Sequence, residues 1–153
     1  MKRTGKIIRG IGLTLFALYL GTLAWASLNP DPIDGQGPIK RFVAWVLSNT
    51  QQNKSLQWLD YNTLEGLANV TLYIPLGLGL ALILRRLKWW ADLSIGIATT
   101  VAVELTQKYL LPHRFSTFQD VLNNSLGVAI GVALGFIYVR STAALRSRRN
   151  AQG

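Results

Sequence analysis

Residues 103–131 read VELTQKYLLPHRFSTFQDVLNNSLGVAIG and decide the architecture of this chain. Between two apolar runs that are each long enough to cross a bilayer, the stretch places charged and amide side chains that include Glu104, Gln107, Arg114, Asp120, Asn123 and Asn124. Such side chains are costly inside a membrane-spanning segment, so they usually face a bundle interior and often mark function. The stretch is therefore the default candidate site.

Composition indicates one membrane domain, residues 1–153. The chain has 153 residues, half of them apolar, and the apolar residues collect in blocks of bilayer length. It contains no cysteine, so disulfide and thiolate chemistry are excluded. The net charge of +9 is also seen in nucleic-acid-binding proteins. However, the basic residues flank apolar blocks, which indicates membrane topology, and we expect no nucleic-acid binding.

The first predicted span covers residues 7–28. Four basic residues lie at its start, and no charged residue occurs from Gly10 to Pro30. A cleavable signal peptide is the alternative, because Ala24-Trp25-Ala26 resembles a cleavage site. The apolar run exceeds the usual signal-peptide length and Trp25 suits an interfacial anchor, so we favour a retained span.

A loop over residues 29–62 follows. Its Pro- and Gly-rich start breaks the first helix. A short amphipathic helix is then predicted from apolar residues at helical spacing, with Lys40 and Arg41 on the other side: Ile39, Phe42, Val43, Val46 and Leu47. Two placements stay open for this helix, which lies either on the membrane surface or against the bundle.

Three further spans are predicted over residues 63–84, 91–111 and 118–139, giving an all-α bundle of four transmembrane helices. Asn62 with Glu65 reads as a capping box for the second span, and Thr117 with Asp120 as one for the fourth. Pro75 lies near the middle of the second span, where we expect a kink, and Pro112 ends the third.

The distribution of positive charge predicts the orientation. With both termini in the cytoplasm, 11 of the 16 Lys and Arg residues lie inside: four at the N-terminus, three at 85–88 and four at the C-terminus. We therefore expect a multi-pass protein of the cell (inner or cytoplasmic) membrane, with the 29–62 loop outside.

This topology brings the polar residues to one depth near the outer side, together with Asn69 of the second span. Glu104 lies seven residues before Leu111, or about 10 Å along the helix. Helical spacing gives the third span a small or polar stripe of Gly96, Thr100, Glu104 and Gln107. The fourth span has a stripe that suits close helix packing: Asp120, Asn124, Gly127, Gly131 and Gly135.

Structural and chemical interpretations of this cluster stay open. Glu104 can pair with Lys108, Arg114 can pair with Asp120, and the asparagines can act as interhelical hydrogen-bonding groups. Alternatively, Glu104 and Asp120 are candidate catalytic residues, an acid/base pair with one pKa raised by desolvation. His113 is the only histidine, which excludes a histidine-rich metal site, and we expect neither a metal nor a cofactor.

These residues resemble the VanZ-like family of membrane proteins over roughly residues 64–135. The family pattern has an Asn, a Pro-x-Gly, a Glu-x-x-Gln, an Arg and an Asp-x-x-x-Asn-x-x-Gly. The chain matches that order with Asn69, Pro75-Leu76-Gly77, Glu104 to Gln107, Arg114, and Asp120 to Gly127, followed by Gly131. The order and spacing of the motifs, more than any single one, carry the resemblance.

The resemblance implies a cell-envelope role at the outer leaflet, linked to resistance to glycopeptides of the teicoplanin type. It also implies membrane lipids and a cell-wall precursor or glycopeptide as partners. The expected binding residues are Asn69, Gln107, Arg114, Asn123 and Asn124. Two functions stay open: a non-catalytic protein that binds or shields an envelope component, which we favour, and an enzyme acting on a lipid-linked head group through Glu104 and Asp120.

Overall fold

The computed structural model describes residues 2–30, 37–84, 88–111 and 116–151. These residues form five α-helices and one short 3-10 turn, and they contain no strand. The elements are α1 (Lys2–Leu28), α2 (Gly37–Gln51), η2 (Lys54–Leu56), α3 (Tyr61–Ile83), α4 (Trp89–Leu110) and α5 (Phe118–Ala151). The predicted all-α class is confirmed.

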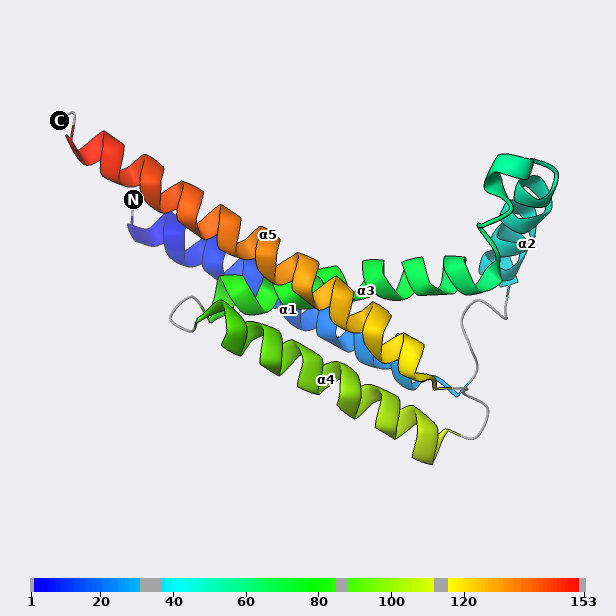
Figure 1. Ribbon diagram of the computed structural model, residues 1–153. Coiled ribbons are helices and arrows are strands. Elements are labelled where there is room, and N and C mark those ends of the chain that lie inside the picture. Colours follow the sequence, from blue (N-terminus) through cyan, green and yellow to red (C-terminus); the bar gives the residue numbers. More distant parts are fainter. Residues whose placement is uncertain (1, 31–36, 85–87, 112–115, 152–153) are drawn as a thin grey trace.

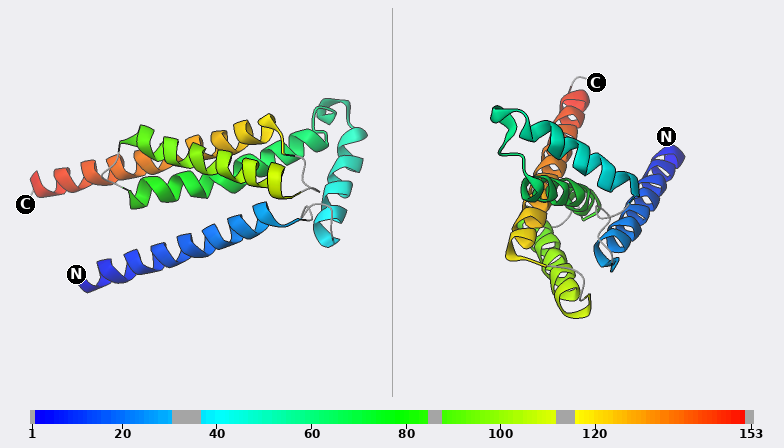
Figure 2. Two further views of the ribbon diagram at one scale, coloured as in Figure 1. Left: turned by 90° about the horizontal axis from the view of Figure 1, so that it is seen from below. Right: turned by 90° about the vertical axis from the view of Figure 1, so that its right-hand side faces the viewer.

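The four long helices run along a common direction, and α2 lies across one end of them (Figures 1 and 2). Successive helices α3, α4 and α5 alternate in direction. The start of α1 and the end of α5 therefore lie at the same end of the molecule (Figure 1). The opposite end holds α2, the start of α3, the end of α4 and the start of α5.

Three helices are long and apolar enough to cross a membrane: Lys6–Leu28, Tyr61–Ile83 and Phe118–Leu145. These agree with the first, second and fourth predicted spans, so the chain is a multi-pass membrane protein. The third predicted span does form a helix, α4, but α4 is not among the candidate spans found in the described residues. Polar residues such as Asp92, Glu104 and Lys108 lower its hydropathy.

One predicted helix boundary needs correction. The N-cap of α3 is Asp60, whose carboxylate accepts hydrogen bonds from the Thr63 backbone N–H at 2.8 Å and from its hydroxyl at 2.7 Å. The predicted cap at Asn62 is wrong, because Asp60 satisfies the free N–H groups of the first turn two residues earlier. Helix α5 continues to Ala151, well beyond residue 139, since nothing after Arg140 interrupts it. Pro75 lies inside the continuous helix α3.

The helices α3 and α5 make the most extensive contact in the molecule. Glycines permit it: a Cβ atom on Gly127 would collide with the Val70 carbonyl oxygen, and one on Gly131 with that of Ile74. A Cβ on Gly135 would come within 2.6 Å of the Ala81 Cβ. Gly77 of α3 faces the Val128 carbonyl in the same way. Small residues let the two backbones approach closely, as is typical of membrane helices.

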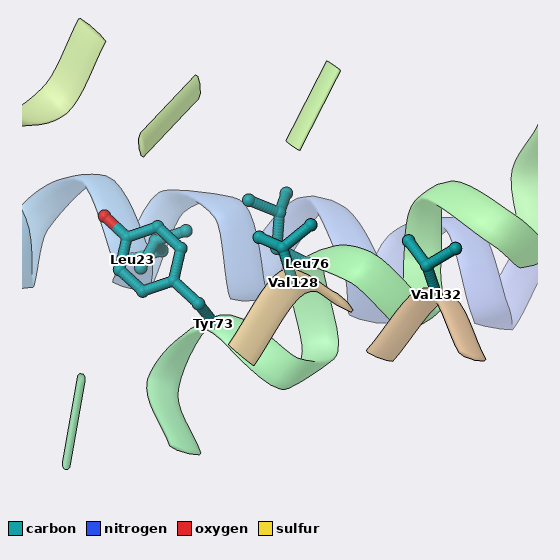
Figure 3. Close-up of a cluster of buried hydrophobic side chains, with 5 residues drawn as sticks. All are labelled: Leu23, Tyr73, Leu76, Val128 and Val132. Atoms are coloured by element: carbon teal, nitrogen blue, oxygen red, sulfur yellow. The ribbon is translucent and has the colours of Figure 1, made fainter. Parts of the chain in front are cut away.

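The apolar core lies where α1, α3 and α5 meet. Its buried members are Leu23, Tyr73, Leu76, Val128 and Val132 (Figure 3). Helix α1 joins this core from the periphery and is far more exposed than α3 or α5. The Tyr19 hydroxyl donates a hydrogen bond to the Leu72 carbonyl at 2.8 Å and so holds α1 against α3.

Candidate functional site

The candidate site is centred on Glu104, whose side chain is 6% exposed on the inner face of α4. The small and polar stripe of this helix is buried along its length at Gly96, Thr100, Glu104 and Gln107. Close packing at Gly96 allows this burial, because a Cβ there would collide with the Val128 side chain of α5. The sequence stripe is therefore the face that α4 turns toward the bundle.

Two side chains hold the Glu104 carboxylate. The Asn124 Nδ2 group of α5 donates a hydrogen bond to Glu104 Oε1 at 2.9 Å. The Ser116 hydroxyl donates to Oε2 at 2.5 Å. Hydrogen bonds to an ionised acceptor are among the stronger ones, so these contacts compensate part of the cost of burying a carboxylate.

Gln107 connects this region to α1. Its Nε2 group donates a buried hydrogen bond to the Ser27 carbonyl oxygen at 2.7 Å. Ser27 lies in the last turn of α1, where carbonyl groups lack partners within the helix. The predicted binding residue Gln107 thus joins α1 to α4.

Asp120 forms a second, separate group of contacts. Its Oδ1 atom accepts a hydrogen bond from Asn69 of α3 at 3.1 Å. Its Oδ2 atom accepts from the Thr117 backbone N–H at 2.9 Å and from the Thr117 hydroxyl at 2.7 Å. The Thr117 hydroxyl also accepts from the Asp120 backbone N–H at 3.2 Å, so the predicted capping box of α5 is confirmed.

Asn123 belongs to the α3-facing side of α5. It is partly buried, and its Oδ1 atom accepts a hydrogen bond from Gln119 at 3.2 Å. A Cβ on Gly66 of α3 would lie 2.8 Å from its Nδ2 atom. Asn123 therefore packs against the start of α3, whereas Asn124 contacts Glu104.

Two buried polar atoms close to Glu104 have no hydrogen-bond partner among the described residues. They are the Tyr73 hydroxyl and Asn124 Oδ1, on side chains that are each only 2% exposed. Tyr73 lies close enough to interact with Ser27 and Glu104, although its hydroxyl makes no hydrogen bond of regular geometry. Buried polar groups without partners are uncommon and often mark the place of a ligand or an ordered water.

Tyr73 was not among the site residues predicted from the sequence. Ser27 was not identified, because it contributes a backbone carbonyl that every residue has. Asp92, a second buried carboxylate at 4% exposure, lies in the first turn of α4. A negative charge there is favourable because it faces the positive end of the helix dipole.

Arg114 and His113 lie outside the described residues. Within the described ranges, no group of three or more His, Cys, Asp and Glu side chains could hold a metal ion. Two open hollows of about 420 and 460 Å³ lie away from Glu104. The first is between α2 and the start of α3, lined by Leu47, Thr50, Gln57, Leu59, Asp60 and Tyr61; the second is at the end of α1, around Trp25 and Leu28.

Comparison with known proteins identifies the family. A family model described as VanZ/LLP1 matches residues 16–139, most of the 153-residue chain. The match includes every residue of the candidate site. None of the curated proteins and none of the solved structures matches significantly. The resemblance drawn from the sequence motifs is confirmed, and the chain belongs to the VanZ/LLP1 family.

Proposed function

We propose that the protein crosses the cell membrane four times, with both termini in the cytoplasm, and binds a polar group of a cell-envelope component at an outer-leaflet site. The ligand is a cell-wall precursor or a glycopeptide, and the role is linked to resistance of the teicoplanin type. The site comprises Asn69, Glu104, Gln107, Arg114, Asp120, Asn123 and Asn124, to which we add Tyr73.

The burial pattern of α4 supports its assignment as a membrane span, the third along the chain. Its polar residues Asp92, Glu104 and Gln107 are buried, so they do not face lipid. The exposed residues of the same helix include a series of apolar side chains: Ile95, Ile97, Val101 and Leu105. A helix with its polar side turned into a bundle can span a bilayer despite a modest average hydropathy. Its antiparallel course beside α3 and α5 agrees with this assignment (Figure 1).

The unsatisfied pair of Tyr73 OH and Asn124 Oδ1 is the observation that carries the binding proposal. Asn124 Oδ1 is an acceptor and the Tyr73 hydroxyl can donate or accept. Hydroxyl and amide groups of a ligand can pair with atoms of this kind, and such groups are abundant in saccharide and peptide head groups. Leaving these atoms unpaired costs about 1–3 kcal/mol each, so a ligand that pairs with them gains affinity.

The arrangement favours binding over acid/base catalysis. Glu104 and Asp120 each use both carboxylate oxygens as acceptors, in separate groups of contacts. A general acid or base must reach a proton of the substrate directly or through one water.

Replacing Tyr73 with Phe tests the proposal. The variant removes a hydroxyl that forms no regular hydrogen bond, so we expect unchanged or higher thermal stability in detergent, together with loss of the glycopeptide-susceptibility phenotype. Tyr19→Phe is the matched control, because its hydroxyl bonds to Leu72 and its loss should lower stability. A well-folded Tyr73→Phe protein with wild-type teicoplanin susceptibility would contradict the proposal.

A further inference from the structure

Helix α2 exposes an aromatic stripe. Ile39, Phe42 and Trp45 follow one another at three-residue spacing and are 44%, 62% and 62% exposed. The rings of Phe42 and Trp45 stack with centroids 6.2 Å apart. Exposed apolar surface of this kind normally marks contact with a partner or a membrane.

The bundle does not cover this stripe. Helix α2 packs mainly on the short turn η2 and contacts the four long helices much less. Its C-terminal end is held there by Thr50, whose hydroxyl donates to the carbonyl oxygens of Leu47 at 3.0 Å and Leu59 at 3.4 Å. Figure 2 shows α2 crossing the end of the bundle at a steep angle to the long helices. A helix so placed runs roughly parallel to the membrane plane if the long helices cross the membrane.

Exposed aromatic residues occur on each of the four long helices at the end of the molecule where α2 lies. They lie near the end of α1, before and at the start of α3, at the end of α4 and at the start of α5: Trp25, Trp58, Tyr61, Tyr109 and Phe118. Trp and Tyr concentrate at the boundary between lipid and water. The level of α2 is therefore the level of the membrane interface.

The charge of the segment agrees with a lipid surface. Residues 37–55 contain Lys40, Arg41 and Lys54 and no acidic residue. Arg41 lies one turn before Trp45, on the side of the helix that borders the aromatic stripe. Arginine binds phosphate groups well and can reach them while its stem covers apolar surface.

We propose that α2 is an interfacial helix that lies in the plane of the membrane. Phe42 and Trp45 insert among the lipid chains just below the head groups, and Arg41 contacts lipid phosphates. The partner of this surface is the phospholipid bilayer itself. This contact holds the α2–η2 segment beside the start of α3, independently of any ligand at Glu104.

Site-directed spin labelling can test this placement, because the natural chain has no cysteine. Single variants Trp45→Cys and Phe42→Cys place labels on the stripe, and Lys40→Cys places one on an exposed position of the opposite side. The full-length protein is reconstituted in bilayers of phosphatidylethanolamine and phosphatidylglycerol. We then compare the accessibility of each label to oxygen, which partitions into lipid, and to a water-soluble nickel chelate.

We expect a higher ratio of oxygen to nickel accessibility at positions 42 and 45 than at position 40. Adding Arg41→Glu to Phe42→Cys should lower the ratio at position 42, because a phosphate contact becomes a repulsion. Equal ratios on both sides of α2 would overturn the proposal. Dipolar broadening between labels at position 45 would show that a second copy of the chain covers the stripe, and would overturn the membrane placement. An unchanged ratio of oxygen to nickel accessibility at position 42 after Arg41→Glu would overturn the phosphate contact.

Discussion

Asn124 of α5 donates a hydrogen bond to the buried carboxylate of Glu104 on α4, with 2.9 Å between Nδ2 and Oε1. The same asparagine leaves its own carbonyl oxygen without a partner among the described residues. One amide group thus serves both the assembly of two helices and the proposed binding of a ligand.

A double-mutant cycle on this pair should reveal coupling. We expect Glu104→Ala and Asn124→Ala to be coupled by roughly 0.6–2 kcal/mol, the range for hydrogen bonds between membrane helices. The measurement is thermal or denaturant stability of the two single variants and the double variant. Thr100 and Ser125, whose hydroxyl oxygens lie 3.3 Å apart, provide a control pair with weaker coupling. Additive effects for Glu104 and Asn124 would contradict the contribution of their bond.

Because α3 and α5 approach each other closely, adding a single methyl group at their contact should lower the stability of the protein. Gly131→Ala would place a Cβ against the Ile74 carbonyl oxygen and within 2.6 Å of the Leu78 backbone nitrogen. We expect a loss of about 1–3 kcal/mol of stability, since backbone atoms cannot move aside cheaply. Gly12→Ala is the control, because nothing lies within 4 Å of its Cβ position. Equal melting temperatures of the two variants in detergent would exclude a tight helix interface at Gly131.

The N-cap of α3 predicts a pH effect. Hydrogen bonds from the Thr63 hydroxyl and backbone N–H lower the pKa of Asp60 below its ordinary value of 3.8. A folded-state pKa below the unfolded value means that the stabilising effect is present above pH 3.8 and is lost as the pH falls through the folded pKa. Asp60→Asn keeps a capping oxygen but cannot titrate.

We therefore expect the stability difference between wild type and Asp60→Asn to be constant near neutral pH and to change only below about pH 4. Thermal melts in detergent from pH 7 to pH 3 provide the measurement. If the stability difference between wild type and Asp60→Asn changed between pH 5 and pH 7 instead, a titratable group other than Asp60 would be responsible.

The proposed orientation can be checked with topology reporters. A reporter fused after Gly153 should behave as cytoplasmic, and one inserted near Asn53 in the segment between α2 and η2 should behave as external. The physical reason is the excess of Lys and Arg at the end of the bundle that holds both termini. The reverse pattern would place Glu104 near the inner leaflet and contradict an outer-leaflet site.

The sequence predicted most helices but not all of their boundaries. Hydrophobic blocks and breakers such as Pro30 located α1, α3 and α5 because a spanning helix needs about 20 apolar residues. The cap at Asp60 was missed, since Asn62 with Glu65 fits the capping-box pattern better than Asp60 with Thr63, and only the folded backbone selects between them. Average hydropathy does not qualify α4 as a span, because it cannot tell a polar residue that faces the bundle from one that faces lipid.

Motif order and helical spacing determined the family and the polar faces of α4 and α5, because these depend only on which residues occur at which interval. Tertiary structure alone decided the partners. It joined Glu104 to Asn124 and Ser116, Asp120 to Asn69, and Gln107 to the Ser27 carbonyl. Helical periodicity states the side of a helix on which a residue lies, but the atom that it meets depends on how neighbouring helices slide and rotate against each other. Here that register is set by the glycine contacts between α3 and α5.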